Sequence, residues 1–241
     1  MVEILTQSQT RSGSPGRVCS FRANILARAF DYPYAPPATP IVFGEGKVGR
    51  FLPQKVLPEG RMVAVEGIGL CVAILAVGSN AAVPVLRRKF GSKPIRLVQG
   101  QVRLHGHTKV HSAHIARYGS MPATLMEQTG QHATTHLQLV PVDHLARLDA
   151  SEAVGTNYDR VWLDRPFQVP WLRRRLPGVW TYRSRHGPAI RDGAPMVLGS
   201  QRQALAHAAE RAAWTLDLPA FVYLLVRDVG FRSAVTQALK T

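Results

Sequence analysis

The sequence has few cysteines, few acidic residues and only short apolar runs. Cys19 and Cys71 are the only cysteines among its 241 residues. They are far apart and in no C-x-x-C arrangement, which offers no zinc ribbon and is typical of a reducing compartment. Lys and Arg together number 30 against 15 Asp and Glu. That excess is spread along the chain and favours contact with nucleic acid, acidic lipid or anionic small molecules.

The apolar run at residues 70–77 is too short for a membrane span, which needs roughly 18 to 20 residues. Residues 1–22 lack the basic start and apolar stretch of a secretory signal. We therefore expect a cytoplasmic protein without membrane contact, in which residues 1–22 form a flexible tail. The hydrophobic fraction of 46% and the charged fraction of 19% are those of a globular chain.

Residues 23–69 have the pattern of a lead-in of short strands and turns, with strands expected at 41–43 and 62–65. Within this segment, residues 44–49 formally match the glycine fingerprint for dinucleotides. The mechanism of that motif needs a helix to begin there, and Pro53 and Pro58 disfavour one. A hairpin turn is the preferred interpretation.

The middle and end of the chain predict alternating elements. Residues 70–77 resemble a buried strand, followed by a helix from residue 81 to a stop at Gly91, with Pro84 in its first turn. Strands are expected at 95–107, 123–126 and 136–140, and a short helix at 141–149. Residues 201–216 and 218–240 are Ala- and Leu-rich, which predicts C-terminal helices, the second of them broken at Gly230.

The turn Val77-Gly78-Ser79-Asn80 lies between the expected strand and helix. Successive amides of such a turn, with the free N–H groups of the first helical turn, suit a carboxylate or an oxyanion. From spacing alone, the preferred interpretation is that Gly78 relieves the turn and that Ser79 or Asn80 simply caps the helix. The Lys-Ser/Thr pair of a nucleotide P-loop is absent.

A second candidate is Glu152, which follows a short helix and precedes a turn leading to Tyr158. A carboxylate held over a cleft can transfer protons, whereas one on the surface is merely solvated.

These features occur in a suggestive order: residues 77–80, then Met121-Pro122-Ala123-Thr124-Leu125, then Leu148-Asp149-x-x-Glu152 leading to Tyr158. The succession, over about residues 70–200, resembles the γ-glutamylcyclotransferase-like superfamily. The resemblance implies an α+β fold, a small mixed β-barrel flanked by helices, with residues 1–69 and the C-terminal helices at 201–241 outside it.

The resemblance also implies a function. The glycine turn would bind a γ-glutamyl group through Val77, Gly78, Ser79 and Asn80, with Tyr158 as a further pocket residue. Glu152 would carry protons while the α-amine of the substrate attacks its own γ-carbonyl and releases 5-oxoproline, without metal or cofactor.

Two positions depart from the pattern of the family. Its tyrosine before the glycine is Val77 here, and its glycine after the glutamate is Ala153. They leave a noncatalytic relative, or a binding module without chemistry, as alternatives.

Two further features have competing interpretations. His105, His107, His111 and His114 could bind a metal, since His105 and His107 would share one face of a strand. Residues 161–186 mix aromatic residues with arginines, a combination that single-stranded nucleic acid requires of a surface. Satisfied or exposed histidines and a barrel edge with a buried aromatic side are the preferred interpretations, and nucleic-acid binding is the alternative function.

Overall fold

The computed structural model describes residues 15–52, 55–91 and 93–240, with side chains described from residue 22 onward. Residues 1–14 of the predicted tail therefore lie outside the described part. Helix α1 (Pro15–Phe30) crosses the boundary that the sequence placed at residue 22.

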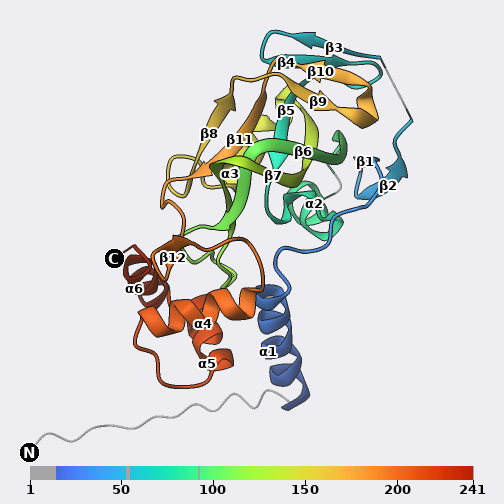
Figure 1. Cartoon of the computed structure of the whole chain (residues 1–241). Coiled ribbons are helices and arrows are strands. Elements are labelled where there is room, and N and C mark those ends of the chain that lie inside the picture. Colours follow the sequence, from blue (N-terminus) through green and yellow to red (C-terminus); the bar gives the residue numbers. More distant parts are fainter. Residues whose placement is uncertain (1–14, 53–54, 92, 241) are drawn as a thin grey trace, which may run out of the picture.

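A nine-stranded mixed sheet forms one part of the molecule (Figure 1). Its main path runs β2-β1-β6-β7-β5-β11-β8, and β4 pairs with β5 and carries β3. The strands are β1 (Ile41–Gly44), β2 (Lys47–Arg50), β3 (Val56–Glu59), β4 (Met62–Val65), β5 (Gly69–Ala76), β6 (Arg96–His111), β7 (Ala123–Pro141), β8 (Tyr158–Leu163) and β11 (Val179–Ser184). The β5–β11 pair is parallel and the others are antiparallel. The α+β class is confirmed, but no strand pairing of the described residues closes this sheet into the predicted barrel.

Strand β5 is buried on both faces, as its unbroken apolar sequence predicts. Cys71, Ala73 and Leu75 join one core cluster, whereas Val72 and Ile74 join another. The second cluster includes apolar residues of α2 (Val83–Phe90) and α3 (Leu145–Ser151). Packing against both faces thus fixes the end of β5, where the glycine turn begins.

The strands β6 and β7, which form a long antiparallel ribbon, are longer than the sequence predicted. Residues 123–126 and 136–140 were expected as two strands but form the single strand β7. The register of the ribbon shifts between His105 and His107, around Gly106 with a φ of 73°. This bulge leaves His105 exposed and His107 buried, so the prediction that they share a face was wrong.

The residues at 44–49 form the predicted hairpin. β1 and β2 pair antiparallel, with Gly44 opposite Lys47. Glu45 and Gly46 between them both have positive φ values, as tight hairpin turns require. No helix follows the glycines in the described residues, so this segment lacks the geometry of a dinucleotide site.

The other part of the molecule is helical, made of α1 together with α4 (Gln201–Arg211), α5 (Leu218–Arg227) and α6 (Val229–Ala238). Figure 1 shows these helices grouped beneath the sheet. They share a separate apolar core that includes Leu205 and Phe221. The predicted division of residues 218–240 into two helices is confirmed, but the break lies at Asp228 and not at Gly230. Asp228 ends α5, and its carboxylate caps α6 by accepting from the Phe231 amide.

The remaining elements connect these parts. They are η1 (Ser79–Ala81), η2 (Val142–His144), η3 (Pro170–Leu172), the hairpin of β9 (Phe167–Val169) with β10 (Arg174–Leu176), and the hairpin of β12 (Ile190–Arg191) with β13 (Ala194–Pro195). None of the helices in the described residues is long and apolar enough to cross a membrane.

Candidate functional site

The glycine turn leads from β5 into a short 3-10 helix, η1, and then into α2. Two buried side chains hold its carbonyl groups: Gln99 donates to the Ala81 oxygen at 2.6 Å, and Gln138 donates to the Asn80 oxygen at 3.0 Å. The amides of Gly78, Ser79 and Asn80 donate to no other described residue. The turn is therefore fixed through its acceptors while its donors remain free for a ligand.

Neither Ser79 nor Asn80 caps α2. The residue before that helix is Ala82, and no side chain caps it. The Asn80 side chain instead donates to Glu152 Oε1 at 2.9 Å, across 72 positions of sequence. The simple capping interpretation is thus excluded for both residues.

Glu152 lies directly after α3, where its amide donates to the carbonyls of Leu148 and Asp149. Its Oε1 forms an ion pair with Lys89, whose ammonium also donates to Asn80 Oδ1 at 2.9 Å. The side chains of Lys89 and Glu152 are only 10% and 13% exposed. All of these bonds use Oε1, and Oε2 accepts none from a described residue. One carboxylate oxygen is thus anchored while the other is available.

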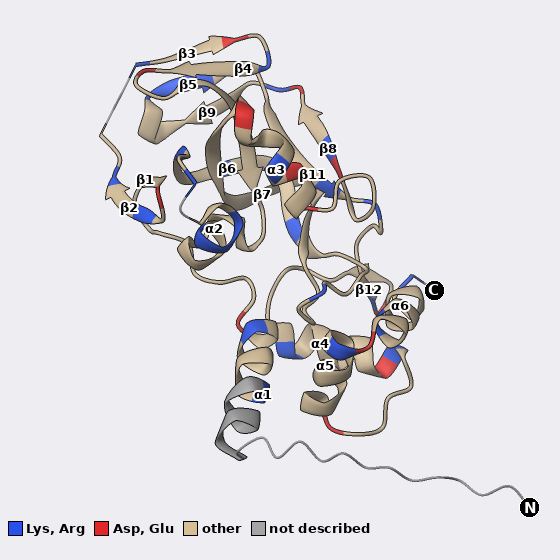
Figure 2. Ribbon diagram, turned by 180° about the vertical axis from the view of Figure 1, so that it is seen from behind, with Lys and Arg blue, Asp and Glu red and all other residues tan. Residues whose placement is uncertain are grey.

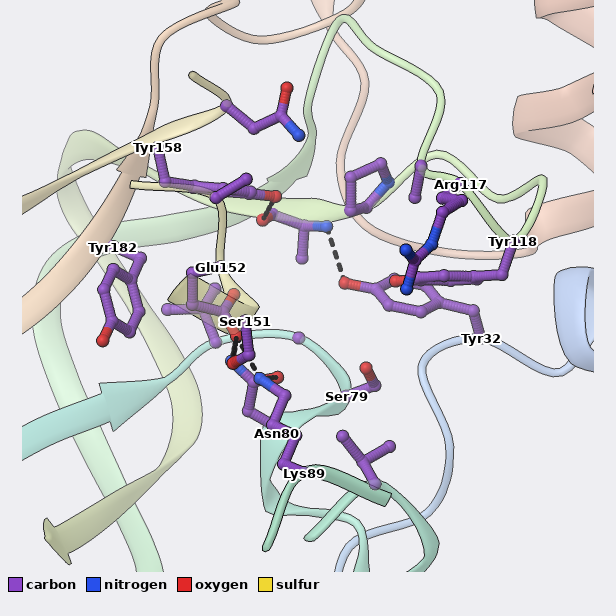
Figure 3. A pocket seen from close by; sticks show the side chains of 18 of the residues that line it. Tyr32, Ser79, Asn80, Lys89, Arg117, Tyr118, Ser151, Glu152, Tyr158 and Tyr182 are labelled. Carbon is purple, nitrogen blue, oxygen red and sulfur yellow. Dashed lines mark hydrogen bonds and ion pairs between the residues drawn. The ribbon is translucent and has the colours of Figure 1, made fainter. Parts of the chain in front are cut away.

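One pocket of about 630 Å³ contains every site residue that the sequence proposed (Figure 3). Its lining includes Val77, Gly78, Ser79, Asn80, Glu152 and Tyr158. They come from the ends of β5, α3 and β8, and both of these strands pair with β11. The structure therefore places all the candidates in one cavity.

Tyr32, from the segment after α1, is a pocket residue that the sequence did not reveal. Its hydroxyl accepts from the Ala123 amide at 2.8 Å, and Tyr158 donates to the Ala123 carbonyl at 3.2 Å. A Cβ built on Gly78 would lie 2.1 Å from the Tyr32 hydroxyl oxygen. Gly78 is thus required because the Tyr32 hydroxyl lies where a side chain would begin. Tyr32 also places a phenol beside the turn, where Val77 supplies none.

Burial raises the pKa of the tyrosines that line the pocket. Burial, followed by the influence of Tyr118, raises the pKa of Tyr32 well above its ordinary value. Burial is also the first cause that raises the pKa of Tyr118 to about 12. At neutral pH these phenols can therefore donate hydrogen bonds, and Tyr32 does so to no described residue.

The second departure from the family pattern, Ala153, adopts a φ of 52°. This is the left-handed region that glycine enters at little cost. Ala153 therefore keeps the backbone conformation that the turn needs, at a steric cost of about 1 kcal/mol.

The chain is structurally similar to gamma-glutamyl cyclotransferase. A solved protein of that description has a TM-score of 0.40 and 12% identity, covering 63% of this chain and 85% of its own. An uncharacterized Homo sapiens protein gives the same values, and a protein from Arabidopsis thaliana has a TM-score of 0.37 and 15% identity over 65% and 92% of the two chains. No family model and no curated protein matches. Similarity of this extent assigns no activity, so the proposal below depends on the pocket residues.

Three of the four histidines considered as metal ligands have separate hydrogen-bond partners, and the fourth, His105, is exposed with its ring near that of His132. His107 contacts the His105 carbonyl, His111 contacts the Met121 carbonyl, and His114 bonds to Ser112 at 2.7 Å. In the described part of the chain, no group of three or more His, Cys, Asp or Glu is placed to hold a metal ion.

The basic aromatic stretch at 161–186 places most of its rings against the core. Phe167 and Tyr182 are buried, and Trp171 and Trp180 pack against the two sheet clusters. The Trp162 ring packs against the Trp180 ring, with 5.3 Å between the ring centres. This packing favours a sheet edge with buried aromatic side chains over a surface on which nucleic-acid bases stack. The sheet itself is open and not a barrel.

Proposed function

We propose that the protein is a γ-glutamylcyclotransferase-like enzyme that releases 5-oxoproline from a γ-glutamyl amine or peptide. The observation that carries the proposal is the contact between Asn80 and Glu152 inside one pocket. It joins the glycine turn to the acid/base candidate, the two features on which the sequence resemblance depends. The free amides of the turn and the free Oε2 of Glu152 supply the two chemical functions that the reaction needs.

The reaction requires the α-ammonium of the substrate to lose a proton before it can attack. Glu152 Oε2 would accept that proton, while Lys89 and Asn80 hold Oε1 and fix the carboxylate. The amine nitrogen then forms a bond to the γ-carbonyl carbon, which closes a five-membered ring. The bond from this carbon to the leaving nitrogen breaks, and the leaving amine takes the proton from Glu152. The ring nitrogen then gives its second proton to the freed carboxylate, which passes it to the leaving amine, so 5-oxoproline is neutral at nitrogen and the amine departs as an ammonium.

The pocket would contribute mainly orientation, because the attack takes place within one molecule. The amides of Gly78, Ser79 and Asn80 would bind the oxygen that becomes negative during attack. Tyr32 would add a phenolic donor at the same turn, in the role that the tyrosine of the family could fill at Val77. No step in this scheme depends on a metal or cofactor.

The test is release of 5-oxoproline from a panel of γ-glutamyl amines and peptides by wild type and Glu152→Gln. The amide cannot accept the proton, so we expect kcat to fall by about 10² to 10⁴. Ser151→Ala is the matched control, because the Ser151 hydroxyl contacts the same carboxylate only at 3.4 Å and makes its shorter bond, at 2.7 Å, to the Leu148 carbonyl, and we expect a much smaller change. Equal release by wild type and Glu152→Gln would remove Glu152 from the mechanism.

A further inference from the structure

The pocket is strongly positive. Of the described residues that line it, five are basic and only Glu152 is acidic: the basic ones are Arg28, Arg88, Lys89, Arg117 and Arg147. Lys89 is paired with Glu152. Arg147 donates to the Lys89 carbonyl at 2.6 Å. The charge of the other three is not used by the reaction proposed above.

These three residues, Arg28, Arg88 and Arg117, form what we call the arginine cluster. Arg28 comes from α1, Arg88 from α2, and Arg117 from the loop between β6 and β7. No carboxylate of the described residues forms a salt bridge with any of them. Figure 2 shows Lys and Arg on both α1 and α2. The cluster is thus assembled from three separate elements.

Arg28, Arg88 and Arg117 are each exposed to solvent, and the charges of Arg28 and Arg117 both act on Arg88. Partial burial, then the charge of Arg28 and more weakly that of Arg117, lowers the pKa of Arg88. The Arg28 guanidinium lies 5.2 Å from the centre of the Tyr118 ring. Figure 3 shows Arg117 on the side of Tyr32 and Tyr118, away from Glu152. The pocket therefore has an acid/base end and a cationic end.

Like charges held together without a counter-ion repel one another, and a bound anion would relieve that repulsion. Arginine is suited to this role because its planar group donates two parallel hydrogen bonds to a phosphate or a carboxylate. Helix C-termini favour a basic residue, which accounts in part for Arg28 and Arg88. It does not account for Arg117, which lies in a loop.

We propose that the arginine cluster binds a dianionic group, a phosphate monoester or a dicarboxylate, carried by the leaving amine of the substrate. This inference rests on the proposed function for its assignment to the leaving amine. The glutamyl part would lie at the glycine turn and Glu152, and the dianion would extend toward Arg28, Arg88 and Arg117. The substrate class would then be a γ-glutamyl amide whose leaving amine carries a group with two negative charges.

The turnover test uses γ-glutamyl amides of four amines: ethylamine, β-alanine, aspartate and 2-aminoethyl phosphate. We expect kcat/KM to rise with negative charge, by at least about tenfold from the ethylamide to a dianionic substrate. The aspartate and phosphate substrates distinguish the two kinds of dianion. Equal kcat/KM for all four would overturn the inference.

The variants are Arg28→Gln, Arg88→Gln and Arg117→Gln. Each should reduce kcat/KM for the preferred dianionic substrate by about tenfold, and reduce it less for the ethylamide. The control is Arg103→Gln, an exposed arginine on β6 that does not line the pocket, and it should keep the wild-type preference. An equal loss of kcat/KM for all substrates, or the same loss in Arg103→Gln, would contradict a role of the arginine cluster in selecting dianionic substrates.

A binding experiment separates this inference from the proposed function. Calorimetric titration with 2-aminoethyl phosphate, aspartate and ethylamine needs no turnover. We expect at least one dianion to bind and ethylamine to bind at least about tenfold more weakly, with the difference reduced in the three variants. If no 5-oxoproline is released but dianion binding still depends on the cluster, the proposed function fails and the anion site remains. If no dianion binds, or binding is unchanged in all three variants, the anion site is excluded.

Discussion

At the scale of single residues, the pocket depends on close approaches that leave little freedom for substitution. Gly78 has no room for a side chain because the Tyr32 hydroxyl occupies it. Ser112 bonds to His114, and the His114 ring stacks on His186 at 4.4 Å. These contacts permit two tests of the pocket that do not depend on an assay.

Gly78→Ala should destabilise the protein by about 1 to 3 kcal/mol, because the new methyl group must displace Tyr32. In Tyr32→Phe the nearest ring atom would be Cζ, 3.1 Å from the same Cβ, so a small shift of the ring would relieve the contact. We therefore expect Gly78→Ala to cost less in the Tyr32→Phe background than in wild type. The measurement is a double-mutant cycle of unfolding free energies in urea. Strictly additive costs would show that the two residues do not collide.

Burial, followed by the charges on His186 and Lys240, lowers the pKa of His114 from 6.5 to about 3. The unfolded chain therefore binds one more proton than the folded chain between these pH values, so stability falls as the pH drops from about 6.5 toward 3. The contribution of His114 is at most about 1.4 kcal/mol per pH unit.

His114→Asn should therefore make the dependence of unfolding free energy on pH shallower by up to this slope, whatever its effect on stability at pH 7. The measurement is urea unfolding from pH 4.5 to 7.5. The control is His105→Asn, which removes an exposed imidazole and should keep the wild-type slope. An unchanged slope in His114→Asn would contradict a buried neutral imidazole.

At the scale of elements, the helical part supports the pocket from outside the sheet. Helix α5 packs against α1, and α1 carries Arg28 and leads into Tyr32. Gln201 of α4 bonds to both backbone groups of Met121, two residues before β7 and Ala123. Helices from both ends of the chain thus hold residues that line the pocket or contact it.

Phe221→Ala, in α5, should lower the unfolding free energy by about 3 to 5 kcal/mol, because this fully buried ring contacts Trp214 and Phe231. Hydrogen exchange should accelerate in α1 and α4–α6 more than in β5–β7, since the two parts have separate cores. Val229→Ala is the matched control, because that side chain is 66% exposed. Equal acceleration in helices and sheet would show that the two cores unfold as one.

At the scale of the whole molecule, the net charge of +15 is distributed over both parts (Figure 2). Such a charge attracts nucleic acid without reading its bases. Because the aromatic residues at 161–186 pack mainly inward, we expect binding of single-stranded DNA to be weak and to lack a stacking contribution.

The test measures binding of a single-stranded oligonucleotide by fluorescence anisotropy and compares wild type with Trp162→Ala. The salt concentration is varied between about 50 and 200 mM, the range over which counter-ion release changes affinity strongly. Affinity should fall steeply with salt in both proteins and be nearly the same in each. A tenfold loss in Trp162→Ala, about 1.4 kcal/mol, would instead match the stacking of a base and favour the nucleic-acid alternative.

Local pattern was sufficient for the elements that carry the site. An apolar run, a glycine turn and a helix with a basic outer face predicted β5, the turn at 77–80 and α2, because each follows from the pattern of neighbouring residues. Local pattern failed where distant contacts decided the structure. Pairing along β6 makes β7 one long strand, and the bulge at Gly106 separates the faces of His105 and His107.

The sequence by itself therefore determined the strand–turn–helix at Gly78 and the placement of Glu152 at the end of a short helix, because both depend on interactions within a few residues. Only the tertiary structure decided that Asn80 contacts Glu152, that Tyr32 takes the place beside Gly78, and that Arg28 reaches the pocket. These contacts join residues about 40 to 90 positions apart, and their formation depends on sheet pairing and on the packed cores of the sheet and the helices rather than on local preference.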